Sequence, residues 1–169
     1  MIDVQSKRDE VLAAAKKKFG FVPNLIKEMV KSPAAAQVYM KGQEVMTEAF
    51  LTNQEQQMIQ LAISTINNCH YCTKAHSALC KLAGTPQEEI EAIQSGSLPQ
   101  DERLKTLVSA TRLIHEKKGW LSEEDLQSLD SLGIDRVQIY EIIALIGLKT
   151  LSNYINHIAH TELDPQMKD

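Results

Sequence analysis

The sequence predicts an all-α protein. Helix start and stop signals are dense along the chain, apolar residues recur at three- and four-residue steps, and no stretch shows the apolar–polar alternation of a strand. The 169 residues suit one domain with its own core, which we expect to span 1–169. Because aromatic residues make up only 5% of the chain, that core should be aliphatic.

Capping residues delimit the first three expected helices. Residues 4–18 favour a helix that ends at the following glycine. Asn24 can cap a short helix over 24–30. Ser32, followed by a proline at the first helical position, opens a helix that runs to about Ala49.

The middle of the chain contains two expected helices separated by a short break. The "TNQE" stretch at 52–55 is a capping box that opens a helix to about Ile66. Two asparagines at 67–68 break it. The next helix covers 69–83, and Gly84 stops it.

Four more helices are expected in the second half. A second capping box, "TPQE" at 85–88, opens the first of them, and apolar spacing predicts another over 101–118. "SEED" at 122–125 and Asp135 open the last two. An apolar stripe on the final helix is predicted from Tyr140, Ala144, Gly147, Leu148, Leu151, Ile155 and Ile158.

Composition excludes several classes of partner. A net charge of −4 and a pI near 5.7 disfavour nucleic acid and anionic membranes, which bind basic surfaces. No apolar run approaches the roughly 20 residues of a bilayer span. The charged start "MIDVQSKRDE" does not resemble a signal peptide, so we expect a cytoplasmic protein with reduced thiols.

The "INNCHYCTKAH" stretch at 66–76 holds the most informative residues. At about 100° per residue, Cys69, Cys72 and His76 share one helix face with Leu79, Cys80 and Ala83. His76 lies one turn after Cys72, within reach of its sulfur directly or through a water. We therefore expect the two cysteines and His76 to form one site.

This arrangement favours a reactive thiol. The first turn of a helix stabilises a thiolate, and a nearby imidazole can accept the thiol proton. A second cysteine can condense with a sulfenic acid to close a disulfide. The alternative is that both cysteines are buried apolar packing. That interpretation is the favoured one for Cys80, which has no special neighbours in the sequence.

Zinc is the rival chemistry for the same residues. Cys69, Cys72 and either His70 or His76 could give three ligands, whereas a tetrahedral site needs four. No second pair follows at zinc-finger spacing, so His157 or His160 could join only through the fold. We expect His70 near the rim of the site and Tyr71 in packing.

Residues 51–84, "LTNQEQQMIQLAISTINNCHYCTKAHSALCKLAG", resemble the core of the AhpD-like alkylhydroperoxidases within the carboxymuconolactone decarboxylase superfamily. The shared features are a capped helix, the C-x-Y-C-x-x-x-H motif and a helix closed by Ala-Gly. "KTLSNYINHIAHTELD" at 149–164 and "GFVPN" at 20–24 are similar to a peroxidase-related branch. Retention of both cysteines places the chain, by resemblance, on the redox side of the superfamily.

The resemblance implies an all-α AhpD-like fold that forms dimers, trimers or hexamers. It also implies hydroperoxide reduction without a bound cofactor, with regeneration by a dithiol or disulfide-reductase donor. By position, Cys72 would be the attacking thiolate, Cys69 the resolving thiol and His76 the proton relay.

One position departs from the family pattern. The relay glutamate of the family lies twelve residues before the first cysteine, where this chain has Gln57. Glutamine can orient a water or His76 but cannot act as a base. Glu55 could replace the relay carboxylate, or it could be the capping-box partner of Thr52.

Two asparagine–histidine pairs, Asn153 with His157 and Asn156 with His160, form a polar face on the last helix. They could satisfy the helix end, line a subunit interface or contribute to the site. At the level of function, a non-catalytic redox sensor or disulfide-exchange protein remains an alternative to a peroxidase, as does a metal-binding or structural helical oligomer.

Overall fold

The computed structural model describes residues 3–167, so residues 1–2 and 168–169 of the expected 1–169 domain lie outside the described range. Within that range the chain is all-α and contains no strand. None of the described helices is long and apolar enough to cross a bilayer. The elements are α1 (Val4–Phe19), α2 (Asn24–Met29), α3 (Pro33–Val45), η1 (Met46–Glu48), α4 (Asn53–Ile66), α5 (His70–Leu82), α6 (Gln87–Gln94), α7 (Glu102–Glu116), α8 (Glu123–Ser131), α9 (Arg136–Ala159) and η2 (Pro165–Met167).

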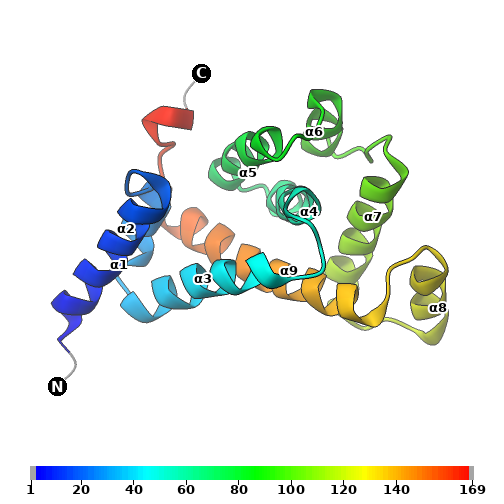
Figure 1. Ribbon diagram of the computed structural model, residues 1–169, viewed down its shortest axis with the longest axis horizontal. Coiled ribbons are helices and arrows are strands. Elements are labelled where there is room, and N and C mark those ends of the chain that lie inside the picture. Colours follow the sequence, from blue (N-terminus) through cyan, green and yellow to red (C-terminus); the bar gives the residue numbers. More distant parts are fainter. Residues whose placement is uncertain (1–2, 168–169) are drawn as a thin grey trace.

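Helix α4 forms the centre of the molecule. Its residues 58–64 are all buried, so it is enclosed on every side rather than on one stripe. Figure 1 shows α4 viewed along its axis, with α5 and α6 above it, α9 below it and α7 beside it. This placement brings the start of α5 and the second half of α9 to the same region.

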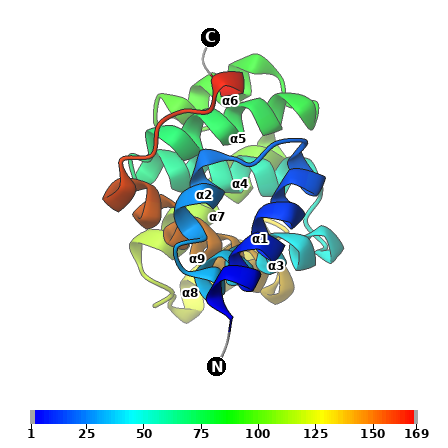
Figure 2. The same cartoon turned by 90° about the vertical axis from the view of Figure 1, so that its left-hand side faces the viewer.

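Helices α1, α2 and α3 form a cover over that region. Their apolar residues belong to one core cluster with Cys69, Tyr71 and Cys72. Leu163 and Met167 of the C-terminal segment pack against the same cluster. Figure 2 views this cover from outside and shows the C-terminal segment passing in front of α5.

Most of the predicted helix boundaries are confirmed, with three local differences. The capping box of Thr52 and Glu55 is present, whereas the one predicted at 85–88 is not, because Pro86 precedes the helix without a side-chain cap. Asn24 is the first helical residue rather than the cap. The helix expected to reach Ala49 ends at Val45 and continues as a 3₁₀ turn.

The predicted apolar stripe of α9 is confirmed only in part. Leu148, Leu151 and Ile155 pack against the core clusters, whereas Tyr140, Ala144, Gly147 and Ile158 are exposed. The fully buried face of the helix comprises Ile139, Ile142, Leu145, Lys149, Ser152, Asn153 and Asn156. Its polar half is buried because the turn after α4 and helix α5 provide hydrogen-bonding partners there, which helical periodicity does not reveal.

Candidate functional site

A tight turn presents the two cysteines. Helix α4 ends at Ile66, Asn68 has a left-handed φ of 53°, and the backbone N–H of Cys69 donates back to the carbonyl of Ser64 at 2.9 Å. Cys69 is then the extended N-cap residue of α5, and Cys72 lies in the first turn. The turn therefore places Cys72 where the unpaired N–H groups of a helix start favour a thiolate.

Both cysteines are free thiols in mutual contact inside the protein. Cys69 is 2% exposed and Cys72 is 1% exposed. A hydrogen bond links the two side chains. Asn156 Nδ2 from α9 donates to Cys72 Sγ at 3.2 Å and lies 3.8 Å from Cys69 Sγ.

The surroundings separate the acidities of the two thiols. The hydrogen bond from Cys69 lowers the pKa of Cys72, burial opposes this, and the charge of Lys149 lowers it further, to about 5. The same hydrogen bond, together with burial, raises the pKa of Cys69. Cys72 is therefore the thiolate of the pair and Cys69 its proton-bearing partner.

His76 lies in this cluster, but neither ring nitrogen bonds Cys72. Its Nδ1 is 2.9 Å from Gln57 Oε1, and its Nε2 is 2.7 Å from Lys149 Nζ. An ammonium group can only donate, so Nε2 accepts from Lys149 and Nδ1–H donates to Gln57. The direct Cys72–His76 hydrogen bond, one of the two predicted options, is thus replaced by contacts to Gln57 and Lys149.

The imidazole is held neutral by this environment. Burial lowers the pKa of His76 well below its usual value, and the neighbouring positive charge of Lys149 lowers it further. Gln57 Nε2 donates to Asn53 Oδ1 at 3.3 Å, which turns the amide oxygen toward the ring. Gln57 therefore orients His76, which is the role expected of a glutamine at that position.

Lys149 of α9 is a residue of this site that the sequence reasoning missed. Its side chain is 0% exposed. Its titratable neighbours in the described structure are Tyr39, Cys69, Cys72 and His76, so no carboxylate is among them. Burial lowers the pKa of Lys149, but Tyr39 and the two cysteines outweigh this and raise it.

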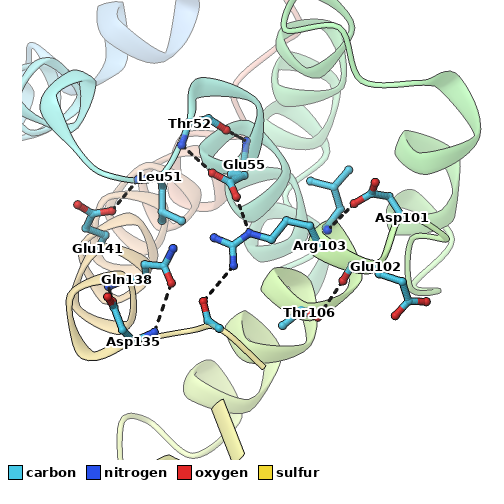
Figure 3. A network of polar contacts seen from close by, with 12 residues as sticks. Leu51, Thr52, Glu55, Asp101, Glu102, Arg103, Thr106, Asp135, Gln138 and Glu141 are labelled. Atoms are coloured by element: carbon cyan, nitrogen blue, oxygen red, sulfur yellow. Dashed lines mark hydrogen bonds and ion pairs between the residues drawn. The ribbon is translucent and has the colours of Figure 1, made fainter. Parts of the chain in front are cut away.

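Glu55 does not join the cluster. Its carboxylate accepts from the backbone N–H of Thr52 at 2.7 Å and from Arg103 Nε at 2.7 Å, as Figure 3 shows. Burial raises the pKa of Glu55, yet the hydrogen bonds from Arg103 and Thr52 outweigh this and lower it. A carboxylate that already accepts two hydrogen bonds and has a lowered pKa is a weak base. The structure therefore supports the capping-box interpretation.

The remaining sequence candidates lie outside the cluster. His70 is exposed at its rim, and Tyr71 is buried with its hydroxyl donating to Asp164. Cys80 is fully buried beside Met58 and Leu61, and burial raises its pKa to about 12, which confirms packing. No group of three or more His, Cys, Asp or Glu residues in the described chain could hold a metal ion.

The polar face of α9 divides between two environments. Asn153 and Asn156 are buried, and Asn153 Oδ1 accepts from Asn67 at 2.9 Å. His157 and His160 are exposed. The asparagines contribute to the site, whereas the histidines do not.

The sequence does contain one signal for the burial of Lys149. Its position falls between Ile142, Leu145 and Ser152, which are core positions of α9.

A comparison with protein-family models gives a match that covers the candidate site. Residues 33–110 match the model of the carboxymuconolactone decarboxylase family, and they include Gln57, Cys69, Cys72 and His76. The comparison with curated proteins gives no match.

Among solved structures, a peroxidase-related protein from Silicibacter sp. TM1040 is similar, with 19% identity and a TM-score of 0.82, over 99% of this chain and 90% of that one. A protein from Ralstonia eutropha JMP134, described as an alkylhydroperoxidase AhpD core, has 19% identity and a TM-score of 0.83, over 98% and 90%. The debrominase Bmp8 has 14% identity and a TM-score of 0.74, over 99% and 91%. At these identities the likeness shows the fold. Residues 33–110 are thus similar to the carboxymuconolactone decarboxylase family, and the whole chain has the all-α fold of these AhpD-like structures.

Proposed function

We propose that the protein is a thiol-dependent peroxidase that reduces alkyl hydroperoxides with Cys69 and Cys72, in antioxidant defence. The supporting observation is the asymmetry of the pair. Cys72 is held as a thiolate at a helix start by Asn156 and Lys149, and Cys69 touches it as a thiol. A nucleophile with its resolving partner in contact is what peroxide reduction through a disulfide needs.

The chemistry follows in two steps. The Cys72 thiolate attacks one oxygen of the hydroperoxide, the O–O bond breaks, and the products are a sulfenic acid and an alkoxide that is protonated to the alcohol. Cys69 then attacks the sulfenic sulfur, which forms the disulfide and releases water. An external dithiol or disulfide reductase returns the pair to two thiols, and no bound cofactor is needed.

Burial of the pair has consequences for access. Because Cys72 is only 1% exposed under the cover of α1–α3, a hydroperoxide reaches it when that cover moves. The cover must also move for the reducing partner to reach the disulfide. We expect this partner in a reducing compartment such as the cytoplasm, where the free thiols would be maintained.

We also expect a homo-oligomer. The outward face of α9 exposes Tyr140, Ile143, Tyr154 and Ile158, whose exposed fractions range from 42% to 83%. Apolar residues along one face of a long helix are suited to a subunit contact. Sedimentation velocity of the purified protein gives the oligomer size.

The test is to titrate the reduced protein with cumene hydroperoxide and locate oxidised cysteines by peptide mass spectrometry. We expect a Cys69–Cys72 disulfide with Cys80 unmodified. Cys72→Ser should abolish hydroperoxide consumption, and Cys69→Ser should stop at a sulfenic acid that dimedone traps. Cys80→Ala is the matched control with unchanged rate. Continued consumption by Cys72→Ser would overturn the proposal.

A redox sensor is the second candidate, and Gln57 favours it. Without a relay carboxylate beside His76, the disulfide could form once and turn over slowly. Repeated cycles with excess dithiothreitol and hydroperoxide distinguish the two. Steady turnover supports the peroxidase, whereas a single stoichiometric oxidation with normal disulfide formation supports the sensor.

A further inference from the structure

The most unusual group in the molecule is the buried lysine of α9. Lys149 has no exposed surface, yet an unpaired ammonium in an apolar interior costs several kcal/mol. Its titratable neighbours in the described structure are Tyr39 of α3 and Cys69, Cys72 and His76 at the start of α5. Lys149 therefore needs a partner among those groups.

Cys72 is the partner that can carry the balancing charge. Tyr39 of α3 is buried and its pKa is raised by burial, so it is neutral at pH 7. Cys69 keeps its proton, and His76 accepts from Lys149 as a neutral ring. The Lys149 ammonium interacts with Cys72 by charge and by a hydrogen bond, which leaves one thiolate opposite one ammonium.

Resting on the peroxidase function, we propose that Lys149 is the proton-carrying catalytic residue of this site, which replaces the missing relay carboxylate. Its Nζ lies 2.7 Å from His76 Nε2, and it is on the helix that brings Ser152 Oγ to 3.9 Å and Asn156 Nδ2 to 3.2 Å from Cys72 Sγ. Gln57, which cannot exchange a proton, serves to orient His76 and through it the Lys149 side chain.

The cycle balances with the site neutral at every stage. In the reduced state Cys72 is S⁻, Cys69 is SH and Lys149 is NH₃⁺. The thiolate takes one oxygen from ROOH, Lys149 protonates the departing RO⁻ to ROH, and Lys149 becomes NH₂ beside the sulfenic acid. Cys69 closes the disulfide and releases water, so the oxidised site holds only neutral groups.

Reduction reverses the charge separation. Two thiols of the external donor return the pair to two protonated cysteines and leave as a disulfide. The proton of Cys72 then passes to the Lys149 amine, which restores the ion pair. A buried amine whose anionic partner has become a disulfide is expected to stay neutral, because burial alone can lower a lysine pKa by several pH units.

Proton counting on the unmodified protein tests this directly. The reduced protein is oxidised with diamide at pH 7 in weakly buffered solution with a pH indicator, and the disulfide is quantified in parallel. We expect no net proton uptake per disulfide, since Lys149 supplies the proton that the diamide product requires. If Lys149 stayed charged, one proton per disulfide would be taken from solvent, and that result would overturn the proposal.

The proton count assumes that Cys72 is a thiolate in the reduced protein. A second measurement tests this assumption. The absorbance of the thiolate at 240 nm is followed against pH for the protein, for Lys149→Met and for the exposed-lysine control Lys41→Met. We expect Lys149→Met to lower the thiolate fraction at pH 6.5 at least tenfold, with Lys41→Met unchanged and Lys149→Arg partly restored. An unchanged titration in Lys149→Met would overturn the ion pair.

Neither measurement uses a hydroperoxide. A protein that passes both but consumes no hydroperoxide would refute the peroxidase function and leave the role of Lys149 in the disulfide cycle intact. A protein that consumes hydroperoxide but takes up one proton per disulfide would refute the role of Lys149 alone.

Discussion

Asn156 is the side chain that joins both sulfurs to the last helix. Its amide donates to Cys72 at 3.2 Å, and a hydrogen bond to a charged group contributes about 1.5–3 kcal/mol. We expect Asn156→Leu to raise the pKa of Cys72 by about one to two pH units. Titration of the absorbance at 240 nm measures this, with the exposed neighbour His157→Gln as control. A pKa that does not move would show that the other neighbours of Cys72, among them Cys69, Lys149 and Ser152, hold the thiolate without Asn156.

His76 makes stability depend on pH below neutrality. Its folded pKa lies well below the unfolded value of about 6.5, so the unfolded chain binds more protons once the pH falls below that value. The unfolding free energy then decreases as the pH falls, by up to about 1.4 kcal/mol per pH unit.

His76→Gln should remove this dependence. The difference in unfolding free energy between the protein and His76→Gln should therefore be smaller at pH 5 than at pH 7.5, because only the protein still has the imidazole to protonate. Urea unfolding at both pH values measures it. The exposed His157→Gln should show the same difference at both, and a difference that grows at pH 5 would contradict a neutral buried ring.

At the scale of the elements, the contacts of Glu55 at the start of α4 decide between its two predicted roles, relay carboxylate and capping-box partner. Its carboxylate closes the capping box on Thr52 and pairs with Arg103 of α7, so it ties two helices together (Figure 3). We expect Glu55→Ala to lower the unfolding free energy by about 1–2 kcal/mol and to leave the hydroperoxide reaction rate unchanged. Denaturant unfolding and the peroxide titration measure both, with the exposed Glu116→Ala as control. A large rate loss at normal stability would return Glu55 to the relay role.

Local sequence signals explain why the helix starts could be predicted. The capping boxes at Thr52, Ser122 and Asp135 act within a few residues, so the sequence alone identifies them. The inward face of α9 does not follow from local signals, because the helix has apolar residues on two sides. Packing against α4 selects the side that also carries Lys149 and Asn156.

At the scale of the whole molecule, the site is assembled from helices far apart in the sequence. Cys69, Cys72 and His76 lie within the first two turns of α5 and its cap, so their shared face could be predicted from spacing alone. The spacing of Lys149 places it among the core positions of α9, but a lysine is normally solvent-exposed, and its contact with His76, 73 positions away, does not follow from local sequence. Tertiary contacts thus add the charge that the motif lacks.

The cover of the site is held by a buried carboxylate near the C-terminus. Asp164 accepts from the backbone N–H of Asn24 at 2.9 Å and from the Tyr71 hydroxyl, and it is 1% exposed. Asn24 also donates through its side chain to the carbonyl of Glu162 at 3.1 Å. These bonds fasten α2 and the C-terminal segment to α5, directly beside the helix turn that carries Cys72.

Loosening this fastening should increase access to Cys72 without changing its acidity. Tyr71→Phe removes a hydrogen bond to a buried carboxylate, and about 1.4 kcal/mol of lost stabilisation corresponds to a tenfold larger open population. We therefore expect iodoacetamide to alkylate Cys72 about tenfold faster at fixed pH, while the titration of the thiolate absorbance stays unchanged. Glu162→Gln is the matched control, because only the backbone carbonyl of that residue takes part. An alkylation rate equal to that of the unmodified protein would mean that hydroperoxides enter by a path that does not open the α2 cover.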